Sequence, residues 1–132
     1  MGKLQEDTLV GLEMEVFDFT ASAEEKLNES FLRTFGWLAK TLLKKMFGDP
    51  AATAAAANLK IKASPQQAQV FSDALRSEKS YMNAFVKYGL NDPRTFNSKW
   101  ELDTAVQKFE RATGLKWPLN KEYNLWLMIF RQ

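Results

Sequence analysis

Apolar residues recur along most of the chain at the spacing of an α-helix. The longest such pattern covers residues 23–47, where apolar positions follow one another at steps of three or four, as one helix face requires. This face consists of Leu27, Phe31, Phe35, Leu38, Leu42 and Met46. Ser22 and Glu25 form a capping box before it, and Gly48 ends it. The pattern predicts a long amphipathic helix that acts as the scaffold of the fold.

Two further helix starts lie in the middle of the chain. Asp49 as N-cap and Pro50 at the first helical position predict a short alanine-rich helix. Residues 64–67 (Ser-Pro-Gln-Gln) are a capping box that opens a longer helix. The apolar face of this helix has one charged interruption, Glu78, among Ala68, Phe71, Leu75, Met82 and Phe85. We expect the polar residues 76–80 to bend this helix or to divide it in two.

The stretch over residues 89–99 is the most loop-like part of the chain, because residues 91–93 (Asn-Asp-Pro) are a turn signal. Loops carry recognition more often than helix faces do, so Arg94 and Phe96 are candidate interface residues. The simpler interpretation, which we prefer, is a plain connector in which Phe96 fills the core between two helices.

Two predicted helices complete the chain. A capping box of Ser98 and Glu101 opens the first, which ends at Gly114, and Asn120 caps the second. Residues 125–130 of the last helix are all apolar, and such a run does not fit a half-exposed surface helix. It predicts either a fully buried element or an interface. The interface candidates in this run are Trp126, Leu127, Ile129 and Phe130.

Residues 9–19 fit two periodicities. Apolar residues alternate with Glu13 and Glu15 as in a strand, but others recur at helical steps of three and four. A strand here has one candidate partner, residues 58–63, whose Lys60 and Lys62 would lie opposite the two glutamates. We prefer the helix, because an isolated pair of strands is only marginally stable. The fold predicted is all-α, a single domain over residues 1–132 with four to six helices and a two-strand element as the alternative.

The composition excludes several kinds of catalytic and metal site but does not identify a function. The chain has no cysteine and no histidine, which excludes disulfides, thiolate zinc sites, cysteine nucleophiles and Ser-His-Asp triads. Glu13, Glu15 and Asp18 form an acidic cluster, but paired catalytic carboxylates also need a substrate cleft, and no calcium-loop motif surrounds the cluster. We therefore expect a surface cluster, no enzyme, no cofactor and no metal site.

Charge is unevenly distributed along the chain. Residues 1–29 hold eight acidic and two basic residues, a balance of −6, whereas residues 30–62 have a balance of +5 and residues 63–132 of +3. The acidic segment either packs against the basic remainder or docks, through Glu13 and Glu15, on a partner. The lysines that form a candidate nucleic-acid-binding patch are Lys40, Lys44, Lys45, Lys60 and Lys62. We do not favour nucleic acid, because the helix dipole accounts for lysines at a helix C-terminus.

Targeting signals are not evident. The N-terminal residues contain acids where a signal peptide has its apolar core, and no apolar run reaches the roughly 20 residues of a membrane span. We expect a chain that is soluble or held within an assembly, and its location is left open.

One stretch resembles a known family. In residues 88–127, six residues follow the order found in the three-helix peptidoglycan-binding module, namely Thr104, Ala105, Val106, Phe109, Gly114 and Leu115. The resemblance implies an accessory module that binds the cell wall. The chain departs from that family's pattern at Glu110, where the family has glutamine, and it lacks the Asp-Gly pair before this helix. We therefore do not assign the chain to the family.

The function these observations favour is a non-catalytic interaction or assembly protein with a protein partner or further copies of itself. A structural or accessory subunit of a larger assembly, such as a virion, fits the apolar C-terminal run. The cell-wall module and a nucleic-acid-binding protein are the alternatives.

Overall fold

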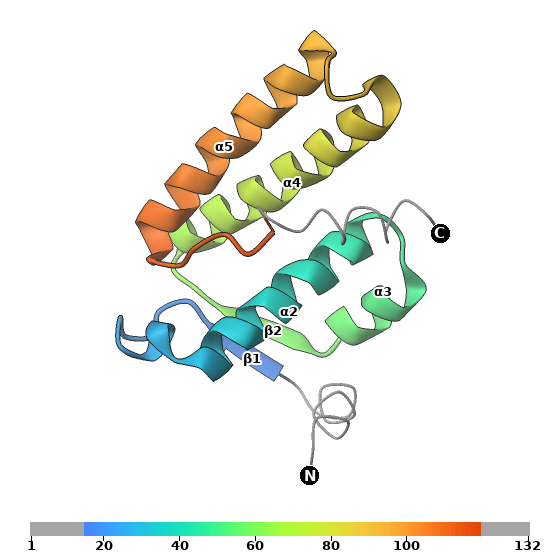
Figure 1. Cartoon of the computed structure of the whole chain (residues 1–132). Coiled ribbons are helices and arrows are strands. Elements are labelled where there is room, and N and C mark those ends of the chain that lie inside the picture. Colours follow the sequence, from blue (N-terminus) through green and yellow to red (C-terminus); the bar gives the residue numbers. More distant parts are fainter. Residues whose placement is uncertain (1–14, 120–132) are drawn as a thin grey trace. The chain divides into compact units, whose positions relative to one another are not determined.

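The computed structural model describes residues 15–119 of the 132 residues. This part of the chain is all-α with a small parallel sheet of two strands, so the predicted fold class is confirmed, and four α-helices lie within the described range. Contacts within the chain separate two compact units, residues 1–63 and residues 64–132. Each unit is described by itself (Figure 1).

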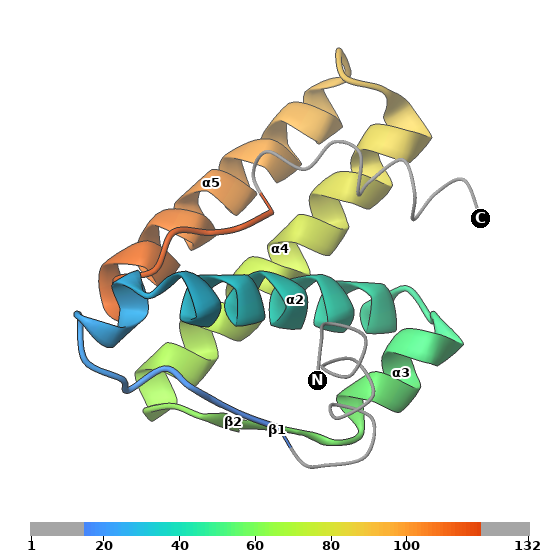
Figure 2. The same cartoon turned by 60° about the horizontal axis from the view of Figure 1, so that its bottom comes forward.

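The first unit has the order strand–helix–helix–strand. Its elements are β1 (Glu15–Asp18), the 3-10 turn η1 (Glu25–Leu27), α2 (Glu29–Met46), α3 (Pro50–Ala56) and β2 (Leu59–Lys62). The strands β1 and β2 are parallel neighbours, and the register pairs Glu15 with Leu59, Val16 with Lys60, Phe17 with Ile61 and Asp18 with Lys62. Parallel strands need a crossover connection, which α2 and α3 supply. Figure 2 shows α2 running across one face of the strand pair.

An aromatic cluster forms the core of the first unit. The ring of Phe17 on β1 lies 4.7 Å from that of Phe31 and 5.5 Å from that of Phe35, both on α2, measured between centroids. Phe19 packs edge-on against Phe17 at 4.9 Å and against Phe35 at 5.8 Å. Phe17, Phe19 and Phe35 are all buried. Because side chains alternate along a strand, Phe17 on the α2 side places Lys60 and Lys62 on the opposite face of the sheet.

The helical interpretation of residues 9–19 is wrong for residues 15–18, which are strand β1, and residues 9–14 lie outside the described range. The alternative pairing with residues 58–63 is the correct one, but its details differ from the prediction. Glu15 is opposite Leu59, and Lys62 is opposite Asp18. Packing of Phe17 on α2 supplies the support that an isolated strand pair lacks.

The scaffold helix starts later than predicted. Asn28 has an extended backbone with ψ of 134° and caps α2 by accepting the amide hydrogen of Ser30 at 2.8 Å, so the helix begins at Glu29. Ser22 does accept the Glu25 amide hydrogen, at 3.1 Å, but this bond closes only the turn η1. Leu27, predicted on the buried face, is 79 % exposed because it precedes the helix.

The predicted alanine-rich helix is present as α3. The carboxylate of Asp49 accepts the amide hydrogens of Ala51 at 2.9 Å and Ala52 at 3.4 Å, and Pro50 occupies the first turn. The Asp-Pro signal therefore acts here as an N-cap followed by a proline that has no amide hydrogen to satisfy.

The second unit is a hairpin of two long helices, α4 (Pro65–Tyr88) and α5 (Pro93–Thr113), followed by residues 114–119 (Figure 1). The capping box before α4 is confirmed by reciprocal bonds between Ser64 and Gln67 of 2.9 and 3.1 Å. The predicted division at residues 76–80 is wrong, because α4 continues through them. Glu78, the charged interruption, is fully buried and accepts a hydrogen bond of 2.9 Å from the indole nitrogen of Trp117.

Candidate interaction surface

The turn between α4 and α5 sets where α5 begins. Gly89 ends α4 with a φ of 87°, which a glycine adopts without strain. Asp92 then caps α5 by accepting the Arg94 amide hydrogen at 2.8 Å, and Pro93 takes the first helical position. The prediction of a loop over residues 89–99 is therefore wrong beyond residue 92. The same Asp-Pro signal that starts α3 starts α5.

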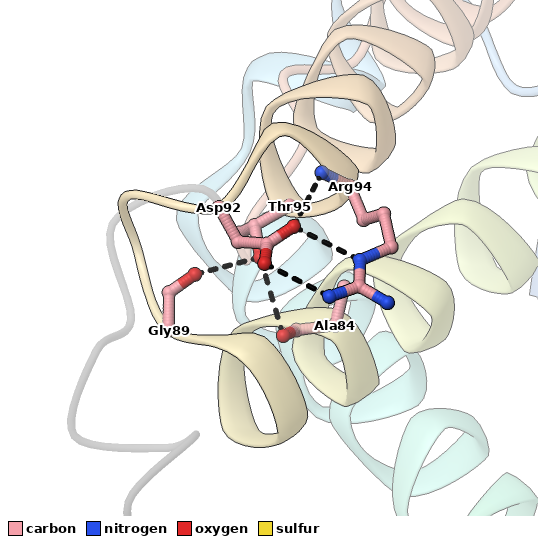
Figure 3. Close-up of polar contacts among 5 residues, drawn as sticks. All are labelled: Ala84, Gly89, Asp92, Arg94 and Thr95. Atoms are coloured by element: carbon pink, nitrogen blue, oxygen red, sulfur yellow. Dashed lines mark hydrogen bonds and ion pairs between the residues drawn. The ribbon is translucent and has the colours of Figure 1, made fainter.

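Arg94 holds this turn together. Its Nε and Nη2 atoms donate to the two carboxylate oxygens of Asp92, each at 3.0 Å (Figure 3). Its guanidinium also lies 3.6 Å from the centre of the Tyr88 ring. The side-chain and backbone hydrogen bonds from Arg94 hold the pKa of Asp92 below its ordinary value, and the Arg94 pKa is raised in return. Arg94 is exposed, but its bonds are already made within the turn, so it is a structural residue first.

Thr95, next to Arg94, fills the core at this end of the hairpin. It is buried, and its hydroxyl lies 2.7 Å from the Gly89 carbonyl oxygen and 3.2 Å from that of Ala84 (Figure 3). The core-filling role preferred for Phe96 is therefore wrong, because Phe96 is 57 % exposed. A helix that turns Thr95 inward points the next residue away from the core.

Two large aromatic rings lie on the outer face of α5. Trp100 follows Phe96 by four residues, which places both on one face of the helix, and it is 69 % exposed. Within residues 15–119, neither ring stacks on another aromatic ring or on a cation. Lys99 and Asp103 form an ion pair of 3.2 Å on the same side of the helix. We name Phe96, Lys99, Trp100 and Asp103 the outer face of α5.

A shallow depression adjoins Trp100. It has a volume of about 170 Å³ and lies between α4 and α5. Its lining residues are Val70, Asp73, Trp100, Glu101, Thr104, Ala105 and Lys108. Asp73 is already bonded to Gln69 and Arg76 along α4, so the depression offers mainly an aromatic wall and an apolar floor.

The remaining predicted interface residues fall mostly outside the described range. Trp126, Leu127, Ile129, Phe130 and Glu13 all lie there, and Glu15 is the first residue of β1. Among the candidates, the structure describes the side chains of Arg94 and Phe96, which both lie in the first turn of α5.

Of the predicted acidic cluster, the structure describes the side chain of Asp18 alone. Asp18 accepts a hydrogen bond of 2.8 Å from the Thr20 amide and another from its hydroxyl, and these bonds, with the nearby Lys62 and Lys26, lower its pKa. A general acid needs the opposite shift. Among residues 15–119 there is also no group of three or more Asp and Glu side chains placed to hold a metal ion.

The five lysines of the candidate nucleic-acid patch are divided between two layers of the first unit. Lys60 and Lys62 are on the face of the sheet that points away from α2, whereas Lys40, Lys44 and Lys45 are on α2 itself. These lysines are close together in the sequence, but the alternation of side chains along β2 turns Lys60 and Lys62 away from α2.

Trp100 was the functional candidate that sequence reasoning missed. The predicted loop over residues 89–99 leaves Phe96 outside any helix, so its four-residue spacing from Trp100 does not indicate a shared helix face. The signal that reveals the pair is Asp92 followed by Pro93, read as a helix start rather than as a turn.

No helix in the described part of the chain is both long enough and apolar enough to cross a membrane. The resemblance of residues 88–127 to the peptidoglycan-binding module stays a prediction, carried by its six residues alone. Comparison of the chain with protein-family models, with curated proteins and with solved structures finds no match.

Proposed function

We propose that this protein is a non-catalytic interaction protein that binds a protein partner through the outer face of α5. The observation that carries the proposal is the pair of exposed rings, Phe96 and Trp100, four residues apart on one helix. Exposed apolar clusters mark interaction sites, and tryptophan is the residue most enriched among those that dominate binding energy. A role as an accessory subunit of a larger assembly is one form of this function.

The rigid start of α5 supports the proposal. The side chains of Asp92, Arg94 and Thr95 make five hydrogen bonds at the hairpin turn, directly before the two rings. A partner that packs on rings already held in place by a helix loses less conformational freedom than one that must order a loop. The sequence-predicted recognition by Phe96 is thus retained, but as part of a helix face.

The test is site-specific photo-crosslinking in cells that produce the protein. A photoreactive phenylalanine analogue at Phe96 is expected to give a covalent adduct with a protein. The matched control is the same analogue at Leu27, which is 79 % exposed in the first unit. Adducts at position 96 that are no more abundant than at position 27 would contradict the proposed function. The mass of the adduct also tells whether the partner is this chain or another protein.

A further inference from the structure

The outer face of α5 carries charges of both signs one helical turn apart. Lys99 and Asp103 lie 3.2 Å from each other, and each side chain is 52 % exposed. Trp100 lies between them in the sequence, and Phe96 lies one turn before it. An exposed ion pair of this kind adds little to the stability of its own helix, so its atoms are available to a partner.

Such a face is complementary to itself. Consider a two-fold axis perpendicular to α5 near residue 101. The axis places Lys99 of one copy opposite Asp103 of the other, and Asp103 opposite Lys99, because a two-fold interface pairs residues reciprocally. The same axis brings the two Trp100 rings side by side. A parallel arrangement would instead put like charges opposite one another.

We propose that the partner on this face is a second copy of the chain, bound with the two α5 helices antiparallel. The inference rests on the proposed function and names its partner. A strongly acidic or strongly basic partner would meet one charge of its own sign on this face, whereas a second copy meets none. The charge pattern therefore favours self-association over a partner of one dominant charge.

The exposed area of the two rings limits the strength of the dimerisation that we expect. Aromatic side chains offer about 150–250 Å² each, so rings that are 57 % and 69 % exposed contribute roughly 250 Å² per copy. Two copies together bury roughly 500 Å² from the rings, and the rest of the outer face and the depression beside Trp100 are needed to pass about 1,000 Å². An interface of this size gives a weak dimer, and we expect dissociation in the micromolar range.

Sedimentation velocity of the full chain from about 1 to 300 µM measures the association. We expect a monomer–dimer equilibrium that Trp100→Ala abolishes. The control variant Leu27→Ala, at an exposed apolar residue of the other unit, should leave the dissociation constant unchanged. A chain that stays monomeric over this range overturns the second copy as partner. The crosslinking at Phe96 then decides separately whether another protein binds there.

Charge exchange tests the antiparallel arrangement. Lys99→Asp makes this part of the face acidic and Asp103→Lys makes it basic, so each variant alone should dimerise roughly tenfold or more weakly, because like charges meet across the axis. An equal mixture of the two variants should recover dimerisation as a heterodimer, and the doubly exchanged variant should dimerise like the original chain. Far-UV circular dichroism checks that both variants remain folded. Dimers that survive both single exchanges, or a mixture that shows no recovery, would overturn the proposal.

Discussion

The cores of the two units differ in the number of polar residues that they bury. The core of the first unit contains a cluster of phenylalanine rings, of which Phe17, Phe19 and Phe35 are buried. Thr41 is the one buried polar residue described in this unit. The described core of the second unit includes three buried polar residues, Glu78, Thr95 and Thr113. Apolar contacts tolerate small shifts, whereas hydrogen bonds require defined partners and angles. Both cores are mainly apolar and contain an aromatic cluster, and the core of the second unit adds hydrogen bonds of defined geometry.

Two buried polar residues of the second unit hold the segment that follows α5. Glu78 on α4 accepts from Trp117, which is 39 residues later. Thr113 donates to the Phe109 carbonyl at 2.8 Å and accepts the Leu115 amide hydrogen at 3.1 Å, where the chain leaves α5. These bonds fix residues 114–119 against the hairpin. This comparison gives three predictions, from the largest expected effect to the smallest.

Replacing Phe35 by alanine tests the aromatic core of the first unit. Phe35 is 1 % exposed and packs against Phe17 and Phe19, so we expect a loss of about 3–5 kcal/mol in the free energy of unfolding. Chemical denaturation measures the loss. Phe96→Ala is the matched control, and at concentrations where the chain is monomeric it should change stability by less than about 0.5 kcal/mol. Equal losses in the two variants would show that the cluster is not the core of its unit.

Replacing Trp117 by phenylalanine tests the directional bonds of the second unit. The change keeps most of the ring volume but removes the indole donor to the buried Glu78 carboxylate. We expect a loss of about 1–3 kcal/mol, because a buried acceptor loses one of its donors. Trp100→Phe makes the same chemical change at a ring that is 69 % exposed and should be nearly neutral. If denaturation gives the same result for both, the bond to Glu78 contributes little and the contrast between the units fails.

Acid titration tests the turn that starts α5. The folded-state pKa of Asp92 is below its ordinary value of 3.8, so the carboxylate stabilises the fold above that pH, and this stabilisation is lost as the pH falls through the lowered pKa. Asp92→Asn should therefore flatten the dependence of unfolding free energy on pH below about 4. Arg94→Gln should raise the pKa of Asp92 toward 3.8 in an NMR titration, because Arg94 makes the bonds that lower it. An unchanged Asp92 pKa would contradict this account.

Local signals predicted the helices well where the cap and the first turn lie next to each other in the sequence. Asp49–Pro50 and the capping box of Ser64 and Gln67 were read correctly, because these bonds span two or three residues. The end of α5 at Gly114 was also read correctly, and its φ of 77° shows why glycine is there. The predicted start of this helix at Ser98 is wrong, because Asp92 and Pro93 of the turn signal are the N-cap and the first helical position of α5.

The candidate site was predicted only in part. Phe96 is among the predicted interface residues, but Trp100 is not. The two share a helix face only in a helix that begins at Pro93. Arg94 was named as a recognition residue, but its guanidinium holds Asp92 and the Tyr88 ring. The candidates at Glu13 and in the C-terminal run lie outside the described residues and stay predictions.

The sequence by itself determined the all-α class, most helix boundaries and the absence of histidine and cysteine chemistry. These follow from periodicity and capping, which involve residues close together in the sequence, and from composition, which does not depend on the order of the residues. Only the tertiary structure decided that Glu15–Asp18 is a strand, that Glu78 is buried and that Phe96 faces outward. Each of these depends on a partner far away in the chain or on a helix start set by the turn before it. The local pattern at residues 9–19 fits both a strand and a helix, and Asp92–Pro93 fits both a turn and a helix start, so the packed structure is needed to choose between them.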